Sequence, residues 1–179
     1  MATLFAFTPN AKPAPFQMKV IVPYTEGTEG FEACKLNLGI LGIRPRLVKL
    51  ERDISYDILF RKLWEEGEPF IIVEHDIVPY PGALERMWES SAPWCGFGYL
   101  VFGKIRSYLG CTKFVPKELG SCPLPDEYQS WQVMDRKIEA ELIKRGFNGQ
   151  IMEPPVAHLN FAHYRQTSDY VEHPRFWSE

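Results

Sequence analysis

The stretch PFIIVEHDIVPYPG, Pro69–Gly82, decides the fold. Its four apolar residues at 70–73 show no polar alternation, which is typical of a parallel strand covered by helices on both faces. The run passes directly into Glu74, His75 and Asp76. Charged groups at the end of a buried strand are costly unless something there needs them. We therefore predict a central strand at 70–73 with a candidate site at its carboxyl end.

Two strand–helix units precede this stretch. KVIVP at 19–23 is followed by apolar positions at helical spacing over 29–41, and RLVKL at 46–50 is followed by a helical pattern that ends at Gly67. Strands that alternate with helices predict a parallel sheet, and ligands bind such sheets beyond the carboxyl ends of the strands. The acidic triplet stands at such an end.

The second half of the chain changes character. Short, glycine-interrupted apolar pieces at 94–103 and 110–116 are typical of strands and bends in a mixed or antiparallel region. Residues 116–130 contain three prolines and are predicted to form a loop. The pattern over 135–146 predicts a helix, with acidic residues early and basic residues late, and a strand-like piece follows at 150–160.

The chain has 179 residues, which is about the size of one domain. We predict a single α/β domain over 19–160, with a Rossmann-like mixed sheet flanked by helices. An irregular arm is expected at 1–18 and a C-terminal tail at 161–179.

Composition narrows the classes of function. A net charge of −3 argues against general nucleic-acid binding, because affinity for the phosphate backbone needs clustered lysine and arginine. The four cysteines show no C-x-x-C spacing, so reduced thiols in a reducing compartment are predicted instead of a thiolate zinc site. Apolar runs are too short for a membrane span, and the N-terminus lacks a long apolar signal region. We therefore expect a cytoplasmic protein.

The paired carboxylates of the triplet admit three roles. They can hold a hard cation, since Mg²⁺ and Mn²⁺ prefer carboxylate oxygen. They can act as acid and base, or they can only cap the following turn, which is the more common role of an isolated E-x-D triplet. The triplet alone leaves these roles open.

The order of the motifs resembles that of inverting glycosyltransferases of the large family 2 type, which have the GT-A fold. VIVPYTE before a helix, FIIVEHD after two strand–helix units, and MDRKIEAELIKRG later in the chain carry the resemblance. It covers about 19–160, and its specificity lies in the order and context of the motifs. A GT-A-like fold is the expectation that follows.

The resemblance implies where the nucleotide-sugar donor binds. The family binds the nucleotide at the loop after the first strand and at the motif after the central strand. The implied residues are Pro23, Tyr24, Thr25, Glu26, Glu74 and His75. Asp53 lies where an acid in this architecture accepts a hydrogen bond from the ribose or the base, and its alternative role is a solvated residue at a helix start.

The resemblance also implies a metal site. In the family a D-x-D motif after the central strand binds the divalent ion, and here Glu74-His75-Asp76 stands in its place. Asp76 keeps the last carboxylate and is the implied ligand of Mn²⁺ or Mg²⁺. A downstream histidine, His158, is the implied second ligand, with His163 as its competitor. A role for Glu74 in binding the ion stays open, as does a core role for His158.

The family's catalytic base lies at the start of a helix. Asp135 matches it, while Met134 replaces the preceding acid. The resemblance implies that Asp135 takes the proton of an acceptor hydroxyl, with inversion at the anomeric carbon; its alternative role is a charge at a helix N-terminus. Trp131 is expected to stack on the acceptor or, alternatively, to anchor the core or a loop.

The sequence thus predicts a metal-dependent inverting glycosyltransferase that moves a sugar from a nucleotide-diphosphate sugar to an acceptor hydroxyl. The acceptor is not specified, and the processive Q-x-x-R-W motif does not occur, which favours transfer of single sugars. Two alternatives remain: a catalytically silent GT-A-like nucleotide-binding protein, and a nucleotidyltransferase. The latter is disfavoured because YTEGTEG at 24–30 has no lysine or arginine to hold a triphosphate.

Overall fold

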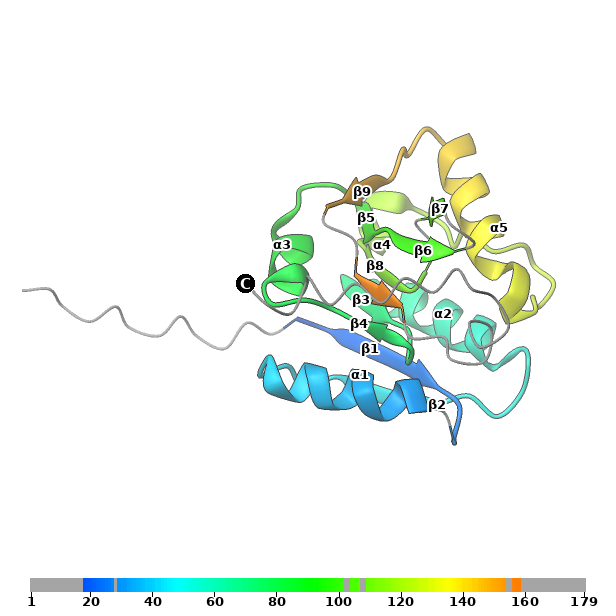
Figure 1. The fold of residues 1–179 in the computed structure, drawn as a ribbon. Coiled ribbons are helices and arrows are strands. Elements are labelled where there is room, and N and C mark those ends of the chain that lie inside the picture. Colours follow the sequence, from blue (N-terminus) through cyan, green and yellow to red (C-terminus); the bar gives the residue numbers. More distant parts are fainter. Residues whose placement is uncertain (1–17, 28, 102–103, 107–108, 154–155, 159–179) are drawn as a thin grey trace, which may run out of the picture.

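Strand β3 (Phe70–Val73) lies inside a six-stranded sheet of order β2-β1-β3-β8-β5-β9. All four of its residues are buried, because helices cover both faces of the sheet (Figure 1). The predicted central strand is therefore confirmed. The computed structural model describes residues 18–27, 29–101, 104–106, 109–153 and 156–158.

The first half of the chain forms the two predicted strand–helix units. β1 (Val20–Tyr24) leads to α1 (Glu29–Ile40), and β2 (Arg46–Lys49) leads to α2 (Ser55–Glu66). β1 pairs in parallel with β2 on one side and with β3 on the other. The carboxyl ends of these three strands therefore lie at one edge of the sheet.

The second half adds the antiparallel component. β8 is antiparallel to both of its neighbours, β3 and β5, and β9 is parallel to β5. The pairs β4–β10 and β6–β7 form separate two-stranded sheets. The elements of this half are β4 (Ile77–Val78), α3 (Ala83–Glu89), β5 (Trp94–Phe97), β6 (Tyr99–Val101), β7 (Lys104–Arg106), β8 (Cys111–Phe114), α4 (Pro116–Leu119), α5 (Trp131–Lys144), β9 (Gln150–Met152) and β10 (Ala157–His158).

Two hydrophobic cores lie on opposite faces of the sheet. Successive side chains of a strand point to opposite faces, so Val20 and Val22 pack with α1 and α3, whereas Ile21 packs with α2, α4 and α5. The result is a three-layer arrangement of helices, sheet and helices (Figure 1). The predicted single α/β domain with a mixed sheet flanked by helices is confirmed.

Two boundaries in the second half differ from the prediction. Residues 116–119 form α4 and not loop, since proline at a first helical position needs no N–H partner. Helix α5 begins at Trp131, four residues before the predicted start at Asp135. Buried Met134 extends the apolar face of α5 back by one turn, and Asp135 consequently lies in the second turn.

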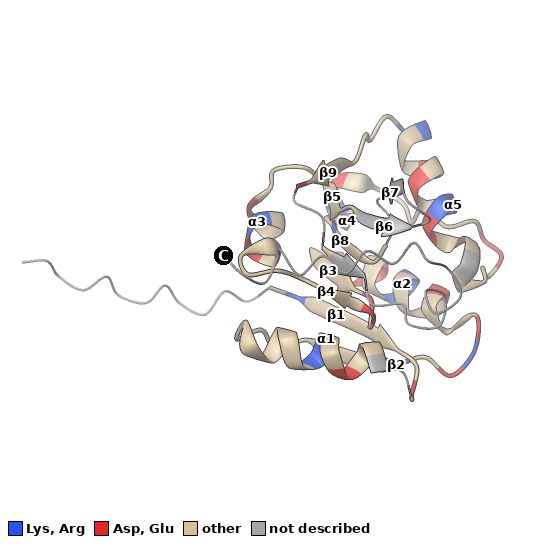
Figure 2. Ribbon diagram, in the orientation of Figure 1, with Lys and Arg blue, Asp and Glu red and all other residues tan. Residues whose placement is uncertain are grey.

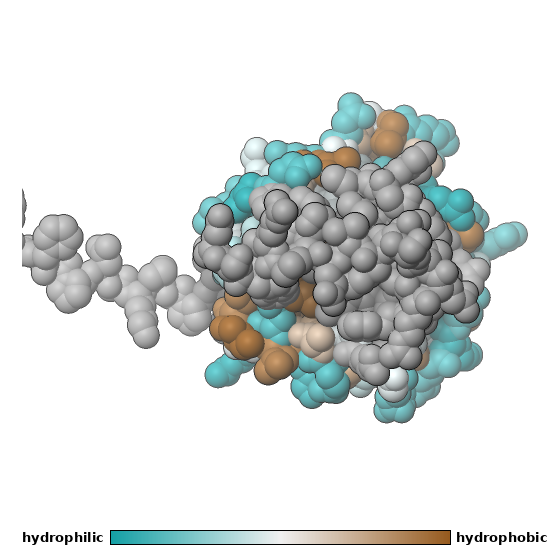
Figure 3. All heavy atoms as spheres, in the orientation of Figure 1, coloured by the Kyte–Doolittle hydropathy of each residue, from teal (hydrophilic) through white to brown (hydrophobic). Residues whose placement is uncertain are grey.

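The ends of the chain fall largely outside the described residues. This holds for the tail predicted at 161–179 and for the arm at 1–18 except Met18. Within the described part of the chain, no helix combines the length and the apolar character that crossing a membrane requires. Exposed apolar side chains gather over the C-terminal half of α1, at Leu36 and Ile40 (Figure 3). Helix α1 starts at the carboxyl end of β1, so this patch lies away from the carboxyl edge.

Candidate functional site

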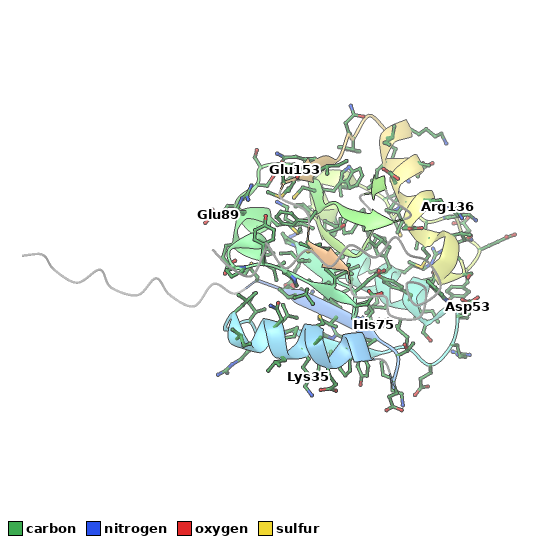
Figure 4. The ribbon with its side chains drawn as sticks, in the orientation of Figure 1. Lys35, Asp53, His75, Glu89, Arg136 and Glu153 are labelled. Carbon is green, nitrogen blue, oxygen red and sulfur yellow. The ribbon has the colours of Figure 1, made fainter. Side chains whose placement is uncertain are left out.

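A cavity of about 420 Å³ opens at the carboxyl ends of β1, β2 and β3. This volume is within the range of small-molecule sites, roughly 300–1,000 Å³. Asp53 and His75, from two of its walls, lie on the same side of the molecule (Figure 4). The cavity is lined by Pro23, Thr25, Leu50, Glu51, Arg52, Asp53, Tyr56, Glu74, His75, Asp76 and Trp131.

The loop after β1 divides its predicted residues between two surroundings. Pro23 and Thr25 line the cavity. Tyr24 instead stacks on Phe31 of α1, with ring centroids 4.1 Å apart, and exposed Glu26 pairs with a lysine 2.9 Å away, Lys49 of β2. Alternate side chains of an extended segment point to opposite sides, so only every second residue of this loop faces the cavity.

The first turn of α1 packs against the loop that carries Asp76. A Cβ atom on Gly30 would lie 3.1 Å from both Cα and Cβ of Asp76, so only glycine permits this approach without a shift. The N-terminal end of α1, with its partial positive charge, therefore lies beside the Asp76 backbone. Sequence reasoning missed Gly30, although its place at a helix start next to the predicted site was a usable signal.

Burial strongly affects the protonation of Glu74. The buried Tyr56 hydroxyl donates a hydrogen bond to Glu74 Oε1 at 3.1 Å. Burial, and after it the nearby charge of Asp76, raises the pKa of Glu74 to about 8. The hydrogen bond from Tyr56 lowers this pKa, and the charge of Asp135 raises it by a smaller amount. Glu74 therefore holds a proton at neutral pH while no cation is bound.

Asp135 lies close enough to Glu74 for its charge to act on that carboxyl. It is half-buried in the second turn of α5, and burial raises its pKa, opposed by the Arg136 N–H that donates to Asp135 Oδ1 at 2.7 Å. A role as a first-turn helix charge is wrong, since α5 begins four residues earlier. A buried carboxylate with a raised pKa is a stronger base than an exposed one.

Asp53 and Trp131 lie at the meeting of α2 and α5. Ser130 Oγ donates to Asp53 Oδ1 at 2.9 Å, and the residue before α2 is Ile54, with no side-chain cap among the described contacts. Asp53 is exposed just before α2 and joins two walls of the cavity. Trp131 is 57% exposed while lining the cavity, so the alternative role as a core anchor is wrong.

The predicted metal ligands come from neighbouring segments. The backbone of His158 pairs with Ile77, the residue after Asp76. The His158 side chain and all of His163 lie outside the described part. Among the residues that the structure describes, no three histidine, cysteine or acidic side chains are grouped to hold a metal ion. The carboxylate oxygens of Asp76 and Glu74 are nevertheless the donor type that Mn²⁺ and Mg²⁺ take.

The cavity carries an excess of acidic groups. Its described lining holds Glu51, Asp53, Glu74 and Asp76 against the single guanidinium of Arg52. Acidic segments accordingly appear where β1, β2 and β3 end (Figure 2). A diphosphate entering alone would meet net repulsion, and an accompanying divalent cation would remove it.

Sequence reasoning also missed an ion pair behind the cavity. Asp57 on α2 is fully buried and accepts from Arg61 and from the main-chain N–H of Gln129. The spacing of an aspartate and an arginine four residues apart on a helix was the available signal. The partner Gln129 is 72 residues away, and no local pattern reveals it.

Comparison with known proteins adds no relative. No model of a protein family matches the chain, and no curated protein matches its sequence. The chemistry of the cavity is therefore the basis on which a function is proposed.

Proposed function

We propose that the protein is a metal-dependent inverting glycosyltransferase that moves a sugar from a nucleotide-diphosphate sugar to an acceptor hydroxyl. One observation carries the proposal: a single cavity gathers the loop after β1, the acidic triplet after β3, and Trp131 at the start of α5. The first two segments are motifs that carry the resemblance, and Trp131 lies three residues before the third motif, MDRKIEAELIKRG.

The donor binds on the side of the cavity formed by β1 and β3. Pro23 and Thr25 contact the nucleotide, and Asp76 holds Mn²⁺ or Mg²⁺ with a second ligand from the His158 segment. When bound, the cation neutralises the diphosphate and stabilises the charge that develops on it as the sugar leaves. The acidic lining favours entry of the diphosphate together with a cation, because the charge of the cation offsets the repulsion.

The acceptor binds on the side formed by α5. An acceptor hydroxyl is a poor nucleophile near neutral pH, so a base must take its proton as it attacks. Asp135, which is half-buried and has a raised pKa, is that base. Attack from the face opposite the leaving diphosphate inverts the anomeric carbon, and the exposed ring of Trp131 supports the acceptor by stacking.

One observation favours a second candidate, a catalytically silent nucleotide-binding protein. Glu74 replaces the family's aspartate, is hydrogen-bonded to Tyr56, and has its pKa raised to about 8. A neutral carboxyl is a poor cation ligand, so tight metal binding would first require loss of this proton. A nucleotidyltransferase is less favoured, since the described lining has one arginine, Arg52, to meet a triphosphate.

The test is a thermal-shift screen of five nucleoside diphosphates, with Mn²⁺ or with EDTA. A ligand at about 100 times its Kd adds about 2.7 kcal/mol of stability, which raises Tm by several degrees. We expect at least one nucleotide to act only with Mn²⁺, Asp76→Ala to abolish the shift, and Asp135→Ala to retain it. Glu32→Ala, an exposed acid on α1, is the matched control.

The same proteins are then assayed for release of nucleoside diphosphate from the matching sugar donor. Release by the wild type and its loss in Asp135→Ala support the transferase. A Mn²⁺-dependent shift without release from any donor selects the silent binder. The absence of a shift with every nucleotide contradicts both.

A further inference from the structure

A buried ion pair lies behind the α5 side of the cavity, in residues that the proposed mechanism does not use. The Asp57 side chain is 0% exposed and that of Arg61 is 21% exposed. Arg61 Nε donates to Asp57 Oδ1, and a terminal nitrogen of Arg61 lies 3.4 Å from Oδ2. Burying charges costs free energy unless both partners are fully hydrogen-bonded, so the remaining contacts of this pair are informative.

Those remaining contacts all go to the segment before α5. The main-chain N–H of Gln129 donates to Asp57 Oδ2 at 2.8 Å. Arg61 donates to the carbonyl oxygen of Pro125 and lies 3.3 Å from that of Glu127. Its guanidinium is 5.6 Å from the centroid of the Tyr128 ring, a cation–π distance. One ion pair on α2 thus holds the main chain over 125–129 at several points.

This segment leads directly into the acceptor wall. Ser130 donates to Asp53, Trp131 begins α5 and lines the cavity, and Asp135 follows one turn later. The donor side is built differently, on loops that leave the hydrogen-bonded strands β1 and β3. The described hydrogen bonds of the ion pair therefore go to the segment that leads into α5 and not to the loops after β1 and β3.

We propose that Asp57 and Arg61 are positioning residues that set the place of the acceptor wall relative to the donor loops, through Trp131, which lines the cavity, and Asp135, one turn further along α5. The proposal rests on the proposed function, since it assigns the two walls to acceptor and donor. Neither residue lines the cavity. An apolar pair of equal volume would keep α2 packed but would not fix main-chain atoms of the loop, which directed hydrogen bonds do.

Arg61→Lys and Asp57→Asn test the proposal. Lysine keeps the positive charge but lacks the planar guanidinium that donates to a carboxylate and to two carbonyl oxygens at once. Asparagine is uncharged and therefore binds Arg61 more weakly. Since misplacement by about 1 Å can cost about 100-fold in rate, we expect kcat for donor hydrolysis to fall at least about tenfold in each variant. The KM for the nucleotide sugar and the Mn²⁺-dependent thermal shift should stay within about twofold of wild type.

The chain supplies a matched control at the other end of α5. Arg145 pairs with Glu141, four residues earlier, at 3.0 Å, and also donates to the carbonyl oxygens of Ser121 and Cys122. Arg145 therefore also binds main-chain carbonyls of a loop, but none of its partners lines the cavity. Arg145→Lys should therefore leave kcat and KM unchanged.

Hydrogen exchange gives a second readout that needs no turnover. The amides of 129–131 should exchange at least about tenfold faster in Arg61→Lys than in wild type, while those of β1 and β3 keep their rates. Equal acceleration in Arg145→Lys, an unchanged kcat in both α2 variants, or a parallel loss of kcat and nucleotide binding would each overturn the proposal. If the wild type binds no nucleotide, the proposed function fails, and exchange at 129–131 still decides whether this ion pair holds the wall.

Discussion

Glu74 and Asp76 are two positions apart, and the charge of Asp76 helps to raise the pKa of Glu74. Burial and the charge of Asp76 keep Glu74 protonated, whereas Asp76 lies beside the N-terminal end of α1. The two carboxyls therefore lie in different surroundings. Asp135 is a third case, a half-buried carboxylate whose raised pKa follows from burial.

The protonation of Glu74 predicts a pH dependence of stability in metal-free protein. Its folded pKa of about 8 exceeds the ordinary value of 4.5, so between these values the folded state binds a proton that the unfolded state has lost. Stability therefore falls as pH rises through this window. In EDTA, the unfolding free energy of the wild type should drop by about 1–3 kcal/mol from pH 6 to pH 9.

Urea denaturation of Glu74→Gln measures this effect. The variant keeps an oxygen that accepts from Tyr56 but cannot titrate, so its loss over the same pH range should be markedly smaller. Glu65→Gln, an exposed position on α2, should keep the wild-type slope. An identical slope in Glu74→Gln would show that this carboxyl is already ionised in the folded protein.

Asp135→Asn should stabilise the protein while removing transfer. Since burial raises the pKa of Asp135, its charged form costs stability once the pH exceeds the ordinary value of 3.8. Asparagine keeps an oxygen for the Arg136 N–H without that charge. A rise in unfolding free energy at pH 7 is expected, together with loss of donor turnover. Retained turnover would remove Asp135 from the role of base.

The cysteines should differ in reactivity. Cys34, Cys95 and Cys111 are buried, and burial raises the pKa of Cys34 to about 12. Cys122 is only partly buried. Titration with a thiol reagent at pH 8 should therefore modify Cys122 first and the other three only on unfolding, and Cys122→Ser should remove the early phase. Early modification of several thiols in folded Cys122→Ser would show that Cys34, Cys95 and Cys111 are not buried in the core.

At the scale of elements, the site depends on how close α1 can approach the loop after β3. Gly30 allows that approach, because a side chain there would meet the Asp76 backbone at 3.1 Å. The α2–α5 contact is made differently, through the ion pair of Asp57 and Arg61 and through the Ser130–Asp53 hydrogen bond. Close packing places one wall of the cavity and polar contacts place the other.

Gly30→Ala and Gly39→Ala, both on α1, should have opposite effects on stability. At Gly39 a Cβ meets nothing within 4 Å, so alanine should add about 0.5–1 kcal/mol through helix propensity. At Gly30 the added methyl must displace Asp76, which should cost about 1–3 kcal/mol and weaken the Mn²⁺-dependent nucleotide shift. Chemical denaturation measures both. Equal stabilisation by the two variants would mean that α1 does not pack on Asp76 this closely.

At the scale of the whole molecule, periodicity predicts the parts of the fold that are periodic. The unbroken apolar run at 70–73 and the helical spacing of 29–41 fix a central strand and a covering helix, because burial on two faces and on one face leaves different patterns. Since parallel strands end at one edge, the convergence of Pro23, Asp53 and Asp76 on one cavity follows from the same reasoning.

Periodicity does not predict which side chains of a loop face the cavity, nor which residues far apart in the sequence are in contact. Spacing alone does not say that Thr25 faces the cavity while Tyr24 faces α1. The pattern over 135–146 predicts the start of α5 four residues too late, because the apolar face of the helix also includes Met134. The hold of Asp57 on Gln129 joins residues 72 positions apart, and only the folded chain brings them together.

The central claim is that this carboxyl edge binds a divalent cation together with a nucleoside diphosphate. Paramagnetic resonance of free Mn²⁺, titrated with protein in the presence and absence of each nucleotide, tests it most directly. The account predicts one tightly bound Mn²⁺ per chain only when the right nucleotide is present, with that binding lost in Asp76→Ala. Nucleoside diphosphates bind Mn²⁺ themselves, so each titration is compared with the same nucleotide without protein. If wild-type protein lowers the free Mn²⁺ signal no further with any nucleotide, the claim is contradicted.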